Sequence, residues 1–229
     1  MSLELEARAR SLGRPLLMGI VNLTPDSFFA PSRASAQAAV DAALRLEAEG
    51  ADLLDLGGES TRPGAEPVSV EDELARVLPV LEAVAARAKV PLSIDTRNAE
   101  TARRALSAGA RVLNDVSALR HDAAMGAVAA EYPLVVLMHM RGDDPRRMQD
   151  EPRYGDVAAE VSAFLRERLE ALGRAGGDPA RAWIDPGIGF GKTAEHNLEL
   201  FRRLEELRSL GHPLLVGASR KSFLGGAPE

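Results

Sequence analysis

The sequence contains no cysteine, few aromatic residues and no long apolar run. Among its 229 residues, Phe, Trp and Tyr together make up 4%. Without cysteine there is no disulfide framework, no thiol nucleophile and no Cys-ligated metal. No apolar run approaches the ~20 residues of a membrane-spanning helix, and the N-terminal residues do not have the pattern of a signal peptide. We therefore expect a cytoplasmic protein.

Lysine is also scarce, and the overall charge is negative. Only Lys89, Lys192 and Lys221 occur, against 25 arginines, and the net charge is −6. A negative chain argues against a nucleic-acid surface. The hydrophobic content of 45% and charged content of 27% are ordinary for globular proteins. Since no linker or low-complexity segment divides the chain, we predict a single domain over residues 1–229.

Short apolar segments alternate with amphipathic ones along the chain. The strands are predicted at Leu16–Asn22, Ala51–Leu56, Pro91–Asp95, Val112–Asp115, Leu134–His139, Ala182–Asp185 and Pro213–Gly217. The helices between them are predicted at Ala34–Glu49, Val70–Ala88, Ala99–Ala108, Ala123–Glu131, Val157–Ala175 and Glu195–Arg208. This alternation predicts an α/β fold, a (β/α)8 TIM barrel, with an open doubly wound sheet as the alternative. Only SRKSFLGGAPE follows the seventh strand, so we expect the eighth strand and the last helices to be missing from this sequence.

Polar residues gather where the predicted strands end. These segments are NLTPDSF, GGESTRPGAEP, IDTR, ND, MHMR, DPG and GASRKSF. The turns that precede the strands (EGAD, SAGA, EYP and SLGHP) are short and plain. Because the active site of a barrel lies at the carboxyl ends of its strands, one rim is predicted to carry the chemistry.

Four rim residues together predict a site for a nitrogen-rich ring: Asp95, Asn114, Asp185 and Lys221. Two carboxylates and an amide can match the donors and acceptors of such a heterocycle, and a lysine can donate to a ring carbonyl or nitrogen. Taken singly, each Asp can instead cap the following helix or turn, and Asn is a common turn residue.

The segment GIGFGKT, residues 187–193, is similar to a phosphate-binding loop. A Walker A motif has four residues between its first glycine and Gly-Lys-Ser/Thr, whereas three occur here. We therefore predict a tight loop after the sixth strand, and leave a weak anion-binding role open.

Seven segments, in order from Leu16 to Gly225, resemble dihydropteroate synthases. They are MGIVNLTPDSF, GGESTRPGAEPV, SIDTR, LNDVS, VLMHMRG, IDPGIGFGKT and GASRKSFLG. The resemblance implies a folate-pathway transferase with a pterin-binding barrel. Such an enzyme joins 4-aminobenzoate to 6-hydroxymethyl-7,8-dihydropterin diphosphate, and yields 7,8-dihydropteroate and diphosphate.

The resemblance also implies roles for individual residues. The pterin would be held by Asp95, Asn114, Asp185 and Lys221, between walls formed by Val116, Met138, Phe190 and Gly217. The other contacts would be Phe28, Thr61, Arg62 and Pro63 in loops that close over aminobenzoate and diphosphate, Ser219 and Arg220 at the aminobenzoate, and Asn22 near Mg²⁺. A homodimer and a Mg²⁺ cofactor are implied as well.

Two departures from the family pattern affect what can be expected. The first loop reads SFFAPS instead of SFSDGG, and nothing matches the Arg-x-His motif of the eighth strand. We expect that loop residues and the C-terminal end are absent from this sequence, so that the intact mass exceeds 24.4 kDa. Two alternatives stay open: the pterin domain of a methyltetrahydrofolate-dependent corrinoid methyltransferase, and a non-catalytic pterin-binding module.

Overall fold

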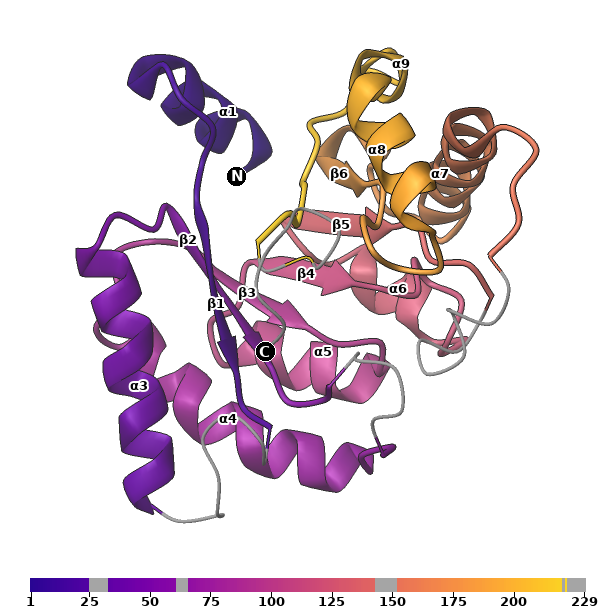
Figure 1. Ribbon diagram of the computed structural model, residues 1–229. Coiled ribbons are helices and arrows are strands. Elements are labelled where there is room, and N and C mark those ends of the chain that lie inside the picture. The colour runs from indigo at the N-terminus through magenta and orange to yellow at the C-terminus, as the bar shows by residue number, and fades with distance from the viewer. Residues whose placement is uncertain (25–32, 61–65, 143–151, 220, 222–229) are drawn as a thin grey trace.

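A computed structural model describes residues 1–24, 33–60, 66–142, 152–219 and 221, and contains a six-stranded parallel sheet (Figure 1). The strands are β1 (Met18–Asn22), β2 (Leu53–Gly57), β3 (Leu92–Asp95), β4 (Val112–Asp115), β5 (Leu134–Met138) and β6 (Ala182–Asp185). Their order in the sheet is their order in the chain. A doubly wound sheet would reverse its strand order at a switch point. The prediction of an α/β fold wound as a barrel is therefore confirmed, and the doubly wound alternative is wrong.

The described residues do not close the barrel. The seventh predicted strand, Pro213–Gly217, runs beside β6 but forms only an isolated parallel bridge between Leu214 and Ile184. Ile184 donates its N–H to the carbonyl of Pro213, and Leu215 donates to the carbonyl of Ile184, both at 3.0 Å. On the other edge, Ile20 of β1 is 59% exposed although it lies on the inner face.

The helices follow the predicted alternation, and in Figure 1 α3 to α8 succeed one another around the outside of the sheet. The helices are α1 (Ser2–Leu12), α3 (Arg33–Ala48), α4 (Val70–Ala85), α5 (Ala99–Ser107), α6 (Met125–Ala129), α7 (Val157–Arg174), α8 (Ala194–Arg202) and α9 (Leu204–Arg208), with a 3₁₀ turn η2 at Pro179–Arg181. The predicted last helix is thus divided in two, at Arg203. None of the helices described is both long and apolar enough to cross a membrane.

The main core lies between the sheet and its outer helices. In α4, Val77 and Leu81 are buried as the apolar pattern indicates, together with Val80 and Val84. Ser69 begins this helix by accepting a hydrogen bond from the N–H of Asp72 at 3.1 Å. The helix also buries Glu73, whose carboxylate accepts hydrogen bonds from α5 and the residue before it. The packing of these helices against one another and against the sheet holds the strands in place. It thereby also fixes where the carboxyl end of each strand lies.

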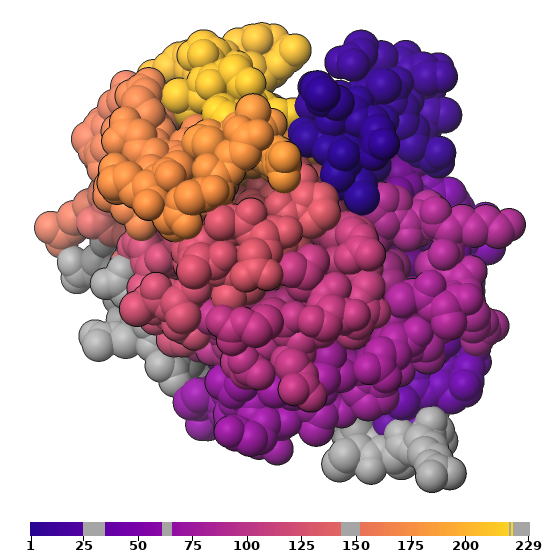
Figure 2. Space-filling view, turned by 180° about the vertical axis from the view of Figure 1, so that it is seen from behind, coloured from indigo at the N-terminus to yellow at the C-terminus, as the bar shows by residue number. Residues whose placement is uncertain are grey.

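A second apolar cluster fills the inner face near the strand starts, and α1 lies against it. Leu5 packs with Val112, Leu134, Val136 and Trp183. The indole N–H of Trp183 donates to the hydroxyl of Ser2 at 2.9 Å. Figure 2 shows α1 (indigo) and the α9 region (yellow) on either side of a notch in the surface. Because α1 occupies this end, a ligand must approach the barrel from the opposite rim.

Candidate active site

The parallel register brings the predicted polar residues to one rim. Asp95, the last residue of β3, lies beside Gly57 of β2 and Asn114 of β4. At the other end of the sheet, Asp185 of β6 lies beside Met138 of β5. These positions alternate in step with the inward-facing residues of the second cluster, so their side chains face the barrel interior. The structure therefore brings the predicted rim residues together.

On one side of this rim the carboxyl groups crowd together. Asn114 donates its amide N–H to Oδ2 of Asp55 at 3.0 Å. Within the described residues, Oδ1 of Asp55 has no partner at hydrogen-bond distance, although the nearby hydroxyl of Ser93 favours the ionised carboxylate. The pKa of Asp95 is raised well above its usual range, first by burial and then by the carboxylates of Asp55 and Glu73. Burial likewise raises the pKa of Asp55. This side can accept hydrogen bonds from a ligand or stabilise a positive charge.

On the other side an aspartate lies close to two lysines. Oδ1 of Asp185 accepts the N–H of Gly187 at 2.6 Å. Burial raises the pKa of Asp185 to about 6, even though that bond, Lys192 and Lys221 all favour the carboxylate. The ammonium of Lys221 lies 4.7 Å from the centre of the Phe190 ring, and burial lowers its pKa while Asp185 raises it. Asp185, Lys221 and Phe190 are thus one group of neighbours.

Apolar walls stand between these two sides. Val116, Met138 and Met140 form a small buried cluster with Phe190 packed against it. Three of these four were predicted, and Met140 was missed although it lies two residues beyond Met138 and so on the same side of an extended chain. A flat ring fits between such walls because both of its faces are apolar.

The loop between Asp185 and α8 is a tight turn, as predicted. Phe190 donates its N–H to the carbonyl of Gly187 at 3.0 Å, and Gly189 donates to the side chain of Asn197 at 2.8 Å. Gly187 has φ +64°, and a Cβ there would collide with the carbonyl of His139. Only glycine allows the loop to press against the end of β5 in this way.

The remaining predicted residues are exposed or lie outside the described residues. Asn22 is exposed at the end of β1, beside Gly57. Gly217 and Ser219 are exposed in the segment that follows the bridge to β6. Five of the predicted residues belong to the segments that the structure does not describe: Phe28, Thr61, Arg62, Pro63 and Arg220.

Sequence reasoning missed three polar features of this rim. Asp55 is a charged residue within the buried strand LLDLG, a pattern that could have identified it. Lys192 is buried in the loop, and its rarity in this chain was the available signal. Arg97 donates two hydrogen bonds to Glu59, at 3.0 and 2.8 Å, and both side chains are almost buried. That pair ties the end of β3 to the segment after β2.

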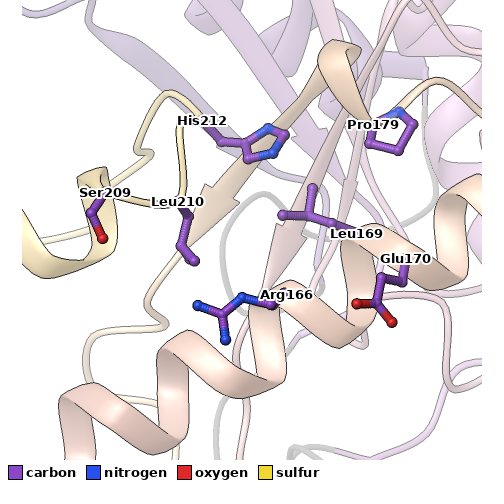
Figure 3. A pocket seen from close by; sticks show the side chains of 7 residues that line it. All are labelled: Arg166, Leu169, Glu170, Pro179, Ser209, Leu210 and His212. Atoms are coloured by element: carbon purple, nitrogen blue, oxygen red, sulfur yellow. The ribbon is translucent and has the colours of Figure 1, made fainter.

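A surface groove of about 350 Å³ lies elsewhere (Figure 3). It is lined by Arg166, Leu169, Glu170, Pro179, Ser209, Leu210 and His212. His212 donates its Nδ1–H to the carbonyl of Ala182, the first residue of β6, at 3.1 Å. The groove therefore lies where β6 begins, away from the rim on which the polar residues converge.

Comparison with known proteins identifies the class. The chain belongs to the pterin binding enzyme family, whose model matches residues 18–228. Within it, the relatives are dihydropteroate synthases: the Synechocystis sp. protein is 45% identical over 214 residues, 93% of this chain and 74% of that protein. The Escherichia coli K12 protein is 44% identical over 227 residues, 98% of this chain and 80% of that protein.

Solved structures agree with this assignment. The dihydropteroate synthase of Xanthomonas albilineans with 4-aminobenzoic acid is 50% identical, has a TM-score of 0.84, and matches 93% of this chain and 76% of that one. The same enzyme in complex with 7,8-dihydropteroate is 47% identical, with a TM-score of 0.81 and coverage of 93% and 76%. The predicted relationship to dihydropteroate synthase, and with it the class of transferases, is confirmed.

Proposed function

We propose that this protein makes 7,8-dihydropteroate from 6-hydroxymethyl-7,8-dihydropterin diphosphate and 4-aminobenzoate. The aniline nitrogen forms a bond to the pterin methylene carbon. The bond from that carbon to the diphosphate oxygen breaks, and diphosphate leaves with the electron pair. The nitrogen then loses one proton to the solvent. The reaction needs no change of oxidation state and no covalent intermediate with the protein.

One observation carries this proposal: acidic and amide groups, a lysine and apolar walls meet at a single rim. Asp95 and Asn114 are neighbours across two strands, and Asp185 lies near Lys221 at the far side. A pterin offers ring N–H and amino donors together with a carbonyl and ring-nitrogen acceptors. We infer that the carboxylates accept from the donors and that Lys221 donates to an acceptor, with Met138 and Phe190 against the ring faces.

Asp95 is placed to assist the departure of diphosphate. As diphosphate leaves, the pterin methylene becomes electron-poor, and a nearby carboxylate stabilises the developing positive charge. The pKa of Asp95 is raised by burial and neighbouring carboxylates. A positive charge in the pterin reverses that effect, because it favours the ionised form. The amine of aminobenzoate is already nucleophilic, so no Ser, Cys or His is required to activate it.

We further propose that Mg²⁺ accompanies the diphosphate, with Asn22 as a protein ligand. Its side chain is exposed at the rim and supplies an amide oxygen. The described residues contain no group of three His, Asp or Glu side chains that could hold a metal without substrate. Mg²⁺ commonly binds through one or two protein oxygens, several waters and substrate phosphates, so a single amide oxygen fits it. When bound, the ion would neutralise charge on the leaving diphosphate.

The experiment is an assay of diphosphate release with both substrates, with the product identified by mass spectrometry. We expect release only when aminobenzoate is present. A methyltransferase would release no diphosphate, and a non-catalytic module would bind pterin in calorimetry without turnover. The exposed-residue variant Asp41→Asn serves as a control. Absence of turnover in the purified protein would refute the proposal, whether or not the protein binds pterin.

A single domain, a homodimer and a cytoplasmic location complete the proposal. The single domain is supported by the unbroken alternation of strands and helices, and the homodimer and the location by the family resemblance and composition alone. Sedimentation velocity at micromolar concentration tests the dimer, for which a monomer mass would be contrary evidence.

A further inference from the structure

Lys192 is a buried lysine for which the proposed reaction has no role. Its side chain is 4% exposed. Its Nζ lies 2.9 Å from Nδ1 of His139, 2.8 Å from the carbonyl oxygen of Gly187 and 3.0 Å from that of Phe190. Lysine is rarely buried so completely without an acidic partner in direct contact. A specific reason for this arrangement is therefore to be expected.

Two neighbours of Nζ are carbonyl oxygens, and the third is an imidazole nitrogen. An ammonium has three N–H donors and can donate to all three, whereas a neutral amine has two N–H groups for the carbonyls and a lone pair that accepts from an Nδ1–H. The contacts to the two loop carbonyls are therefore made in either form. Burial lowers the pKa of Lys192 to about 7, while Asp185 raises it, so the two forms interconvert close to neutral pH.

His139 completes this network as a neutral ring. Burial, and then the charges of Lys192 and Arg120, lower the pKa of His139 to about 2. When Lys192 is charged, its ammonium donates to Nδ1 and the proton of the neutral ring is on Nε2. The lysine thus joins the residue after β5 to the loop after β6.

Two residues of the proposed pterin site are attached to that loop, one before it and one within it. Asp185 precedes it and accepts the N–H of Gly187, while the ring of Phe190 faces Lys221. Lys192 donates hydrogen bonds to the carbonyls of both Gly187 and Phe190. Its positive charge also favours the carboxylate of Asp185.

We propose that Lys192 is a positioning residue of the pterin site, which fixes Phe190 through the loop carbonyls and places a positive charge near Asp185. This inference rests on the proposed function, because it assigns Asp185 and Phe190 to pterin binding. Lys192 itself does not touch the ligand. Lys221, by contrast, contacts the ligand in this proposal, because it donates a hydrogen bond to the pterin ring.

The test compares Lys192→Met with the wild-type protein, and uses Lys89→Met as a matched control because Lys89 is exposed. The probe is 6-hydroxymethyl-7,8-dihydropterin in calorimetry. We expect the Kd of Lys192→Met to rise at least tenfold at pH 6 and that of the control to stay unchanged. Hydrogen exchange of the peptide over residues 187–192 should become about tenfold faster in Lys192→Met alone.

The pH dependence separates positioning by charge from simple packing. At pH 9 the wild-type amine has lost its charge and one N–H, so the affinity ratio between wild type and Lys192→Met should be at least threefold smaller than at pH 6. The other charged groups that act on Lys192 are Asp185 and Lys221, and Arg120 and Arg141 act on its neighbour His139. All of these remain in both proteins. A pure packing role would give the same ratio at both pH values and would overturn the inference.

The remaining outcomes are also decisive. If wild type binds the probe and Lys192→Met binds it equally well, the inference is wrong and the proposed function stands. If wild type does not bind the probe, the proposed function is wrong, and the inference that rests on it is wrong as well. Should Lys192→Met not fold, Lys192→Gln keeps two N–H donors without the charge. It is expected to bind more weakly than wild type at pH 6, and equal affinity would again overturn the inference.

Discussion

Replacing Asp185 with Asn should stabilise the ligand-free protein while it weakens pterin binding. The carboxyl group of Asp185 is buried, with the residue 6% exposed, and one of its oxygens accepts the N–H of Gly187. An amide oxygen can accept the same bond. The substitution therefore removes the charge and leaves the local hydrogen bond in place.

The magnitude follows from the pKa of Asp185, which burial raises from 3.8 to about 6. A group whose pKa is raised by folding stabilises the folded state below the unfolded pKa, and this contribution is lost as the pH rises through the folded value. The carboxyl group therefore destabilises the wild type by ~0.5 kcal/mol at pH 4 and ~3 kcal/mol at pH 8, relative to a residue that does not titrate. The free energy of unfolding of Asp185→Asn, relative to that of the wild type, should therefore increase by ~2.5 kcal/mol between pH 4 and pH 8.

Urea unfolding of both proteins from pH 4 to pH 8, followed by circular dichroism, measures this difference. An effect of the amide that does not depend on pH shifts the plot of this free-energy difference against pH without changing its slope. For Asp41→Asn, at an exposed position, the difference in free energy of unfolding from the wild type should not change with pH. A flat difference for Asp185→Asn as well would refute the reasoning, because the buried carboxyl group would then have its ordinary pKa.

Three further predictions concern other aspartates and Lys221. Asp95→Asn should reduce turnover at least a hundredfold while circular dichroism shows an unchanged fold; wild-type rates would remove Asp95 from its role. Lys221→Ala should raise the calorimetric Kd for pterin more than the KM for aminobenzoate, and equal losses would contradict the assignment. Asp52→Ala should lower the free energy of unfolding by ~2 kcal/mol, because the N–H of Leu17 and two arginines lose their acceptor; unchanged urea unfolding would contradict this.

The sheet could be predicted because both faces of its strands are apolar. Each of the six strands lies within two residues of its predicted bounds, since a segment such as LVVLM has no amphipathic helical alternative. The buried side of a helix is harder to predict. In α4 the apolar residues Val70, Leu74 and Leu78 are only partly buried, because the spacing alone does not fix which side of the helix meets the sheet.

The site could be predicted in its outline but not in its connections. The position of Asp95 or Asp185 at a strand end is visible in the sequence, because parallel strands end at a common rim. The contact between Lys192 and His139 joins residues 53 positions apart. Nothing in local spacing indicates such a contact. The bond between Asn114 and Asp55 joins residues 59 positions apart, and it depends on the register of two strands that are not neighbours.

Two buried aspartates at opposite ends of the barrel show what separates a structural carboxylate from a binding one. Asp52, just before β2, has almost no exposed surface but lies near solvent beside two partly exposed arginines. Its pKa is lowered because hydrogen bonds from Arg14, Leu17 and Arg8 outweigh the effect of burial. Asp185 has one backbone donor and a raised pKa. Among the described residues, the first carboxylate has donors from Arg8, Arg14 and Leu17, and the second has the N–H of Gly187. Low exposure alone therefore does not mark a binding residue. A buried carboxylate with few donors is the better candidate, because a ligand with N–H groups can supply further hydrogen bonds.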